Sequence, residues 1–311
     1  MKIGVIGAGA VGRACLLSLV NQEIGRDIVL VNRTRERAEG MITDIQYGAT
    51  LRAAVSLKAG DYADLKGADI VLITAGVNEK TGGATDRNDD EGRLRLLEDN
   101  VAVYKDMIPQ IVAAAPEAVL LVITDPPDPL AELSLKLAGH NKVVSAGTFL
   151  DTQRLRFHLA QHLKVHPSSV QGMVLGEHGT SQVIIWSSVR IGGIPLMHYL
   201  DCDEGRCGDF QKEIEEEVRH ANITIIEGTG ASQLGIGMVS ARLTQAILHD
   251  ERVVLPVGSH VPEYGTTLSV PSIVGKEGVV ERLTPYLSER EAEQMQESAQ
   301  VIAAAYKESG C

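Results

Sequence analysis

The sequence predicts an α/β fold, with a doubly wound parallel sheet followed by an α+β domain. Two observations predict the first part. A glycine-rich turn follows the first apolar run, and further apolar runs then alternate with helix-like segments. A third observation, the change of this pattern around Gly147, predicts the second part. We therefore expect one domain at residues 1–146 and another at 147–311.

The glycine-rich turn joins an expected strand, Ile3 to Ile6, to an apolar helix from Val11 to Val20. In a dinucleotide-binding turn, the first glycine permits the sharp bend and the second admits the pyrophosphate. The third lets the helix pack on the strand, and the helix N-terminus attracts the phosphates. Strand, glycines and helix in this order predict a Rossmann domain. The expected cofactor contacts are Gly7, Gly9, Ala10, Val11 and Gly12.

The remaining elements follow from periodicity. Further buried strands are expected at residues 28–31, 69–74, 118–124 and 142–145. In the second half, strands are expected at 182–191 and 268–273, and helices at 210–227, 232–249 and 288–307. The segment 94–115 is helical in pattern, and Pro109 is expected to kink or divide it. Residues 76–93 are charged and without periodicity, which predicts a segment that is either disordered or functional, and in the second case a mobile lid.

Composition limits the classes of function. The chain has 311 residues, 44% hydrophobic and 23% charged, and a net charge of −12, which argues against nucleic-acid binding. The sequence shows no run long enough to span a bilayer and no expected signal peptide. Four cysteines, at 15, 202, 207 and 311, are irregularly spaced and lack zinc-like pairing. We expect them to be reduced thiols in a cytoplasmic protein that holds no metal.

Three residue types suited to hydroxy-acid chemistry lie in the second half, at Asp151, Arg154 and His178. Arginine binds a carboxylate through two parallel hydrogen bonds. Histidine exchanges protons near neutral pH, and an aspartate can orient and tune it. Taken singly, Asp-x-x-Arg is more often a surface ion pair and a histidine beside glycine a turn residue. Downstream of a dinucleotide fingerprint, the combination favours catalysis.

With these elements placed, nearly the whole chain resembles the lactate/malate dehydrogenase family, closest to the L-lactate and L-2-hydroxyisocaproate branch. The matching stretches are the N-terminal glycine turn and four others. These are Ala68-Asp69-Ile70-Val71-Leu72-Ile73-Thr74-Ala75-Gly76, Leu150-Asp151-Thr152-Gln153-Arg154, Leu175-Gly176-Glu177-His178-Gly179 and Leu268-Ser269-Val270-Pro271.

The resemblance implies a role for each matching residue. His178 would exchange a proton with the substrate oxygen, Asp151 would hold the other imidazole nitrogen, and Arg154 would bind the substrate carboxylate. Arg93 matches the lid arginine that polarises the carbonyl group. Ser232 falls at a position that lines the pocket, and further cofactor contacts are expected at Thr74, Ala75, Gly76, Asn100 and Thr124. The family habit also implies a homo-oligomer, either a dimer or a tetramer.

Three features depart from the family pattern. Asp125 follows Thr124 where the family has an asparagine, which places an extra carboxylate near the substrate. Asn32 occupies the position of the acid that contacts the ribose, and Arg33 follows it, so NADP is modestly favoured over NAD. Alternatively, Asn32 bonds the ribose while Arg33 and Arg35 face water. The lid at 77–92 is long, so the register of Arg87, a candidate for binding a second carboxylate, is open.

The expected function is reversible hydride transfer between a nicotinamide cofactor and a 2-oxo/2-hydroxy monocarboxylate. A malate dehydrogenase is the main alternative. A nicotinamide-dependent glycosidase is a weaker alternative, because such enzymes typically hold a metal through cysteine and histidine, and no cysteine accompanies His178. A non-catalytic dinucleotide sensor would not need Asp151, Arg154, His178 and Arg93 together.

Overall fold

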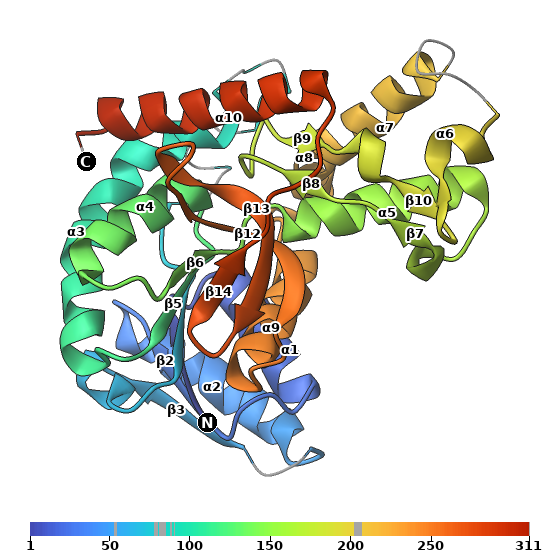
Figure 1. Cartoon of the computed structure of the whole chain (residues 1–311). Helices are drawn as coiled ribbons and strands as arrows, with labels where there is room; N and C mark the ends of the chain where they lie inside the picture. Colours follow the sequence, from blue (N-terminus) through green and yellow to red (C-terminus); the bar gives the residue numbers. More distant parts are fainter. Residues whose placement is uncertain are drawn as a thin grey trace.

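The computed structural model describes residues 1–52, 55–77, 80, 85–87, 89, 91–201 and 207–310. Its centre is a nine-stranded sheet in the order β14-β13-β12-β6-β5-β4-β1-β2-β3 (Figure 1). The six strands of the first half are parallel. They are β1 (Lys2–Ile6), β2 (Asp27–Val31), β3 (Ser56–Gly60), β4 (Ile70–Ile73), β5 (Val119–Val122) and β6 (Val143–Ser145).

Helices cover both faces of this sheet, which confirms the doubly wound prediction. The first half contributes α1 (Ala10–Asn21), α2 (Arg35–Ala49), α3 (Leu97–Ala114) and α4 (Pro127–Ala138), with short 3-10 turns η1 (Tyr62–Leu65) and η2 (Gly92–Leu96). One apolar cluster joins the sheet to α1 and α2 through side chains such as Leu19 and Ile42. The other joins it to α3 and α4 through Tyr104 and Leu130.

The second half begins with α5 (Phe149–Leu163), whose first turn carries Asp151. It continues through η3 (Pro167–Ser169), β7 (Val170–Gln171), β8 (Val174–Leu175), β9 (Val183–Ile184), η4 (Trp186–Ser188), β10 (Arg190–Ile191), β11 (Ile194–Pro195) and α6 (Leu196–Tyr199). The remaining elements are α7 (Gly208–Arg219), α8 (Ala221–Thr229), α9 (Leu234–Leu248), β12 (Val253–Val261), β13 (Thr266–Gly275), β14 (Gly278–Arg282) and α10 (Glu289–Glu308).

The two halves share the central sheet. Strands β12, β13 and β14 pair antiparallel, and Gly258 of β12 pairs with Ser145 of β6. A second contact between the two halves is that of α9 with α1, where Gly237 approaches the backbone of Ala14. The second half is thereby fixed against the carboxyl ends of the parallel strands.

Several expected elements differ in the structure. Helix α3 runs through Pro109 without division, because Pro109 lies on the exposed side, where water can bond the carbonyl left without a donor. The strand expected at 182–191 is two short strands separated by η4. There Ser187 donates its backbone N–H to Glu291 instead of to a neighbouring strand. The helix expected at 210–227 is divided at His220 into α7 and α8.

The prediction of four reduced cysteines is wrong at Cys207, which is disulfide-bonded. Pairing depends on two Cβ atoms lying within about 4 Å, which spacing in the sequence does not reveal. Cys15 is a free thiol in the core, and burial raises its pKa to about 12. Within the described ranges, none of the helices combines the length and the apolar character that crossing a membrane requires.

Candidate active site

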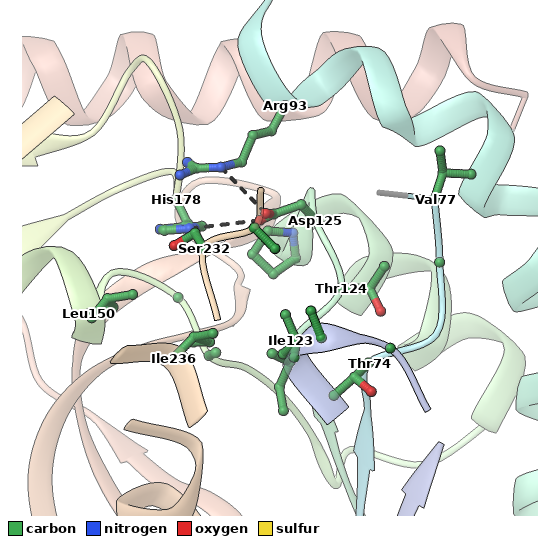
Figure 2. Close-up of a pocket in the computed structure, with 18 of the residues that line it drawn as sticks. Thr74, Val77, Arg93, Ile123, Thr124, Asp125, Leu150, His178, Ser232 and Ile236 are labelled. Carbon is green, nitrogen blue, oxygen red and sulfur yellow. Dashed lines mark ion pairs between the residues drawn. The ribbon is translucent and has the colours of Figure 1, made fainter. Parts of the chain in front are cut away.

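A cavity of about 150 Å³ lies where β1, β4, β5 and β6 end and the second half begins. Crevices at the carboxyl ends of parallel strands are the usual ligand sites of such sheets. Figure 2 shows its polar side chains converging from both halves. The lining includes Gly9, Ala10, Val11, Thr74, Gly76, Arg93, Thr124, Asp125, Arg154, His178 and Ser232 from the sequence-based set. It also includes Val77, Ile123, Pro127, Ala146, Gly147, Leu150, Ala231 and Ile236.

Asp151 links the two basic residues of the second half. Its Oδ1 pairs with Nη1 of Arg154 at 2.8 Å, one turn further along α5, and its Oδ2 is hydrogen-bonded to Nδ1 of His178. The Asp151 side chain is only 2% exposed, whereas that of His178 is 11% exposed. This arrangement fixes one imidazole nitrogen on a carboxylate and turns the other, Nε2, toward the cavity.

Neighbouring charges shift the pKa values of His178 and Asp151. Burial by itself would lower the pKa of His178, but the charge and the hydrogen bond of Asp151 raise it above the ordinary value. Burial opposes ionisation of Asp151 as well, yet His178, Arg154 and Arg93 together hold the pKa of Asp151 well below its usual range. The imidazole therefore accepts a proton readily at neutral pH, which suits a general acid and base.

The carboxylate of Asp125 stands opposite this histidine, at the end of β5. Its Oδ1 lies 3.7 Å from Nε2 of His178, and its Oδ2 lies 3.4 Å from Nε of Arg93. The dashed lines in Figure 2 mark both pairs. Arg93 belongs to η2, and its side chain is only 10% exposed. The residue that departs from the family pattern thus contacts the two groups that would face a substrate oxygen.

Other predicted site residues support the backbone around the cavity. Asn100 is fully buried, donates from Nδ2 to the carbonyl of Asp125 at 2.8 Å and accepts the N–H of Val77. Thr124 donates from Oγ1 to the carbonyl of Ala75 at 2.9 Å, and Thr74 donates to the carbonyl of Ile6. These bonds tie β1, β4 and β5 together at the ends that face the cavity.

A second cavity adjoins the first and shares Gly9, Thr74, Gly76 and Val77 with it. It runs past β2 and is also lined by Asn32, Arg33, Thr34, Arg37, Asp61 and Tyr62. Two adjoining cavities that meet at the glycine turn fit an extended dinucleotide. The glycines fit it too. A Cβ on Gly12 would lie 2.0 Å from the carbonyl oxygen of Gly7, whereas a Cβ on Gly9 would project into open space.

Asn32 is fixed beside the glycine turn. Its Oδ1 accepts the N–H of Ala8 at 2.9 Å, and its Nδ2 donates to the carbonyl of Thr34 at 2.9 Å. Arg35 is engaged elsewhere, with Glu39, Asp61 and the carbonyl of Ala59. Arg33 is exposed and lines the second cavity. The cations that line this cavity are therefore Arg33 and Arg37, and Arg35 is not among its lining residues.

Comparison with known proteins assigns the family. Residues 1–146 match the NAD binding domain of lactate/malate dehydrogenases, and residues 148–309 match their alpha/beta C-terminal domain. The chain belongs to the lactate/malate dehydrogenase family.

Relatives match this family member from end to end. It is 42% identical over 310 residues to an L-lactate dehydrogenase of Thermus aquaticus, and 39% identical over 303 residues to one of Deinococcus radiodurans. Each alignment covers 97% of both chains. A solved lactate dehydrogenase from a Medee basin deep-sea metagenome library has a TM-score of 0.91 and 32% identity. That match covers 100% of this chain and 99% of the other.

Half of the segment 77–92 of this lactate/malate dehydrogenase family member, where a lid is expected, lies outside the described residues. Arg87 is described, and it points to α8, where it bonds Thr224 Oγ1 at 3.2 Å and Glu227 Oε2 at 2.9 Å. The structure therefore places Arg87 outside the cavity lining, in contrast to Arg93. Within the described ranges, no cluster of histidine, cysteine, aspartate and glutamate is arranged to hold a metal ion.

Sequence reasoning missed two kinds of site residue. The apolar wall of Ile123, Leu150 and Ile236 gives no signal of its own, because its members read as ordinary core positions. Asp128 was also missed, although a carboxylate in the first turn of α4, three residues after Asp125, was visible. Its Oδ2 accepts the backbone N–H of His178 at 2.7 Å.

Proposed function

We propose that this enzyme is an L-2-hydroxy acid dehydrogenase of the lactate type, acting on 2-oxo/2-hydroxy monocarboxylates. The observation that supports this most is the convergence of Arg154, His178 and Arg93 on one small cavity beside the dinucleotide groove. Membership of a dehydrogenase family favours this activity over the glycosidase and sensor alternatives. The corresponding division is a dinucleotide-binding domain at 1–146 and a catalytic domain at 147–311.

The bound nicotinamide supplies the hydride in reduction and accepts it in oxidation. This chain's residues do the rest. A guanidinium has five N–H donors, so Arg154 can hold the substrate carboxylate bidentately while one nitrogen stays on Asp151. In reduction, Nε2 of His178 gives a proton to the carbonyl oxygen, and in oxidation it takes the proton back. Asp151 stabilises the imidazolium in both directions, and Arg93 meets the charge that develops on oxygen.

The apolar part of the cavity lining favours a substrate with a single carboxylate. Ile123, Leu150 and Ile236 line the side opposite the polar groups (Figure 2) and offer an apolar surface to the substrate side chain. A second substrate carboxylate would need another cation there. We therefore rank monocarboxylates ahead of oxaloacetate and malate.

The direct test follows oxidation of the reduced cofactor at its absorbance band, with pyruvate, oxaloacetate and branched 2-oxo acids. We expect a monocarboxylate to be preferred. Arg154→Lys should raise KM strongly, because an ammonium cannot form the bidentate bond. Arg156→Lys is the matched control, because Arg156 lies on the same helix and bonds the carbonyl of Gly172. Equal losses in both variants, or no activity with any 2-oxo acid, would refute the proposal.

For the cofactor, we propose that NADP is used at least as well as NAD. Asn32 carries no charge to repel a 2′-phosphate, and Arg33 and Arg37 line the same cavity. Arg35 does not line this cavity and is paired with Glu39 and Asp61. Kinetics with both cofactors at one saturating 2-oxo acid concentration test this preference.

We also propose a homo-oligomer, a dimer or a tetramer. The packed helices α1 and α9 leave Leu17, Leu234 and Met238 exposed, which supports a further interface on this side. Light scattering after size-exclusion chromatography tests the oligomeric state, and a monomer would refute the proposal.

A cytoplasmic location also stays a proposal, since the disulfide at Cys207 removes the reduced-thiol argument for it. Cell fractionation decides this.

A further inference from the structure

Asp128 is a fully buried carboxylate next to the catalytic cavity that the mechanism above does not use. It lies in the first turn of α4. Its Oδ2 accepts the backbone N–H of His178 at 2.7 Å, and its Oδ1 accepts the hydroxyl of Ser145 at 2.7 Å. The same hydroxyl accepts the N–H of Gly147, which lines the cavity. Asp128 therefore connects the first half of the chain to the main chain of the acid/base histidine.

The surroundings fix this carboxylate in place. A Cβ on Gly258 would lie 2.5 Å from Oδ1 of Asp128 and 2.8 Å from Cβ of Ser145. Only a residue without a side chain leaves room there. Gly258 is also the residue of β12 that pairs with Ser145 of β6. The position of Asp128 is thus set by α4, β6 and β12 together.

Three main-chain contacts among the described residues help to hold the loop that carries His178. Gly176, at φ +81°, pairs with Ser269 of β13, and the N–H of Glu177 donates to Oγ of Ser298 at 2.9 Å. The third contact is the bond from His178 to Asp128. The first two use a backbone carbonyl and a hydroxyl as acceptors, whereas the main chain of His178 donates to an ionisable group.

A buried carboxylate has an energetic cost that a neutral acceptor would avoid. Burial raises the pKa of Asp128 to about 6, even though hydrogen bonds from His178 and Ser145 oppose the shift. The charge of His178 also favours the ionised form of Asp128. By reciprocity, ionised Asp128 favours the imidazolium form of His178. An asparagine could accept the same hydrogen bond from His178 but would carry no charge to favour the imidazolium.

We propose that Asp128 is a positioning residue for His178, which fixes its main chain and whose negative charge favours the protonated imidazole. The inference rests on the proposed acid/base role of His178. Other charged groups also act on this histidine and stay in place in the test below: Asp151 at Nδ1, and Asp125 and Arg93 on the cavity side. Glu177, the preceding residue, acts on Asp128 and also stays in place. Asp128 differs from them because it accepts a hydrogen bond from the backbone N–H of His178.

The test is Asp128→Asn, which keeps the size and an acceptor oxygen and removes the charge. We expect the pKa of His178 to fall by about one unit. The alkaline limb of kcat/KM for 2-oxo acid reduction and the acid limb for 2-hydroxy acid oxidation should both move to lower pH. KM for the 2-oxo acid, measured where His178 is fully protonated, should change less than about twofold, because Arg154 is untouched.

Imidazole 15N chemical shifts give the pKa of His178 without any turnover, so the inference can fail or hold independently of the proposed function. Glu132→Gln is the matched control. Glu132 lies one turn further along α4, is buried, and bonds His260 and Thr267 away from the cavity. It should leave the pKa of His178 unchanged.

If Asp128→Asn does not fold, Ser145→Ala replaces it. That variant removes one donor to the carboxylate, which favours protonation of Asp128 and should move the same limbs in the same direction by a smaller amount. An unchanged pKa of His178 in a folded Asp128→Asn or Ser145→Ala variant would overturn the proposal, as would an equal shift in Glu132→Gln. A shifted pKa without turnover of any 2-oxo acid would refute the proposed function instead.

Discussion

The carboxylate of Asp125 forms an ion pair with the guanidinium of Arg93, with 3.4 Å between Oδ2 and Nε. This pair joins the turn after β5 to η2, next to the segment expected to form a lid. Because His178 lies 3.7 Å from the other oxygen of Asp125, one carboxylate touches both groups that are expected to meet the substrate oxygen. The Asp125 carboxylate thus offsets the charge of the guanidinium that is proposed to meet the substrate oxygen.

Asp125→Asn is expected to keep the fold and to raise kcat/KM for simple 2-oxo acids. The substrate then no longer competes with a carboxylate for Arg93. A partly exposed pair of this kind contributes up to about 1 kcal/mol, so the gain should reach about fivefold at most. Steady-state kinetics with pyruvate check this.

The control for that variant is Asp89→Asn, which removes an ion pair with Arg95 away from the cavity lining. It should leave kcat/KM unchanged. If Asp125→Asn gives an equal or lower ratio, Asp125 has a positive role, such as selection of an unusual substrate.

Asp151→Asn is expected to shift the pH dependence of reduction. Reduction needs protonated His178, and the charge of Asp151 raises the pKa of that imidazole against the effect of burial. Without the charge, the pKa falls and the alkaline limit of kcat/KM moves to lower pH. At the pH optimum, kcat should fall by about 10²-fold or more, because the imidazole loses its orientation and its charge partner. A pH–rate profile coincident with that of the wild type would contradict the role given to Asp151.

The cofactor proposal predicts opposite effects of two neighbouring substitutions. Asn32→Asp should restore repulsion of the 2′-phosphate and move the preference toward NAD. Arg33→Ala should lower kcat/KM for NADP by about 10- to 100-fold, the value of a charge-assisted hydrogen bond of about 1.5–3 kcal/mol. Arg35→Ala is the control and should have little effect, because Arg35 pairs with Glu39 and Asp61. A wild type that strongly prefers NAD, with NADP kinetics insensitive to Arg33→Ala, would show the proposal to be wrong.

Arg87→Ala tests the malate dehydrogenase alternative. Since Arg87 is engaged with Thr224 and Glu227 on α8, its loss should change kcat/KM for pyruvate and for oxaloacetate by less than about fivefold. Parallel assays with both acids measure this. A clear preference of the wild type for oxaloacetate that vanishes in Arg87→Ala would reassign the enzyme as a malate dehydrogenase.

The sequence by itself determined the features that depend on short-range patterns. The run from Ile3 to Gly12 fixes a buried strand, a glycine turn and a helix N-terminus, because each of these needs only neighbouring residues. The same holds for the parallel strands and for Asp151 and Arg154, which lie one helical turn apart on α5. The candidate site could therefore be anticipated from motifs, although most of its apolar wall could not.

Only the tertiary structure decided which distant groups meet. Asp125 touches Arg93 and His178, Asp128 bonds the main chain of His178, and Gly258 joins β12 to β6. The disulfide of Cys207 and the intact helix through Pro109 were likewise invisible, because one depends on spatial approach and the other on exposure to water. Ion pairs and buried hydrogen bonds form where packing brings separate elements together and excludes water. Short-range sequence patterns do not predict which elements come together in this way.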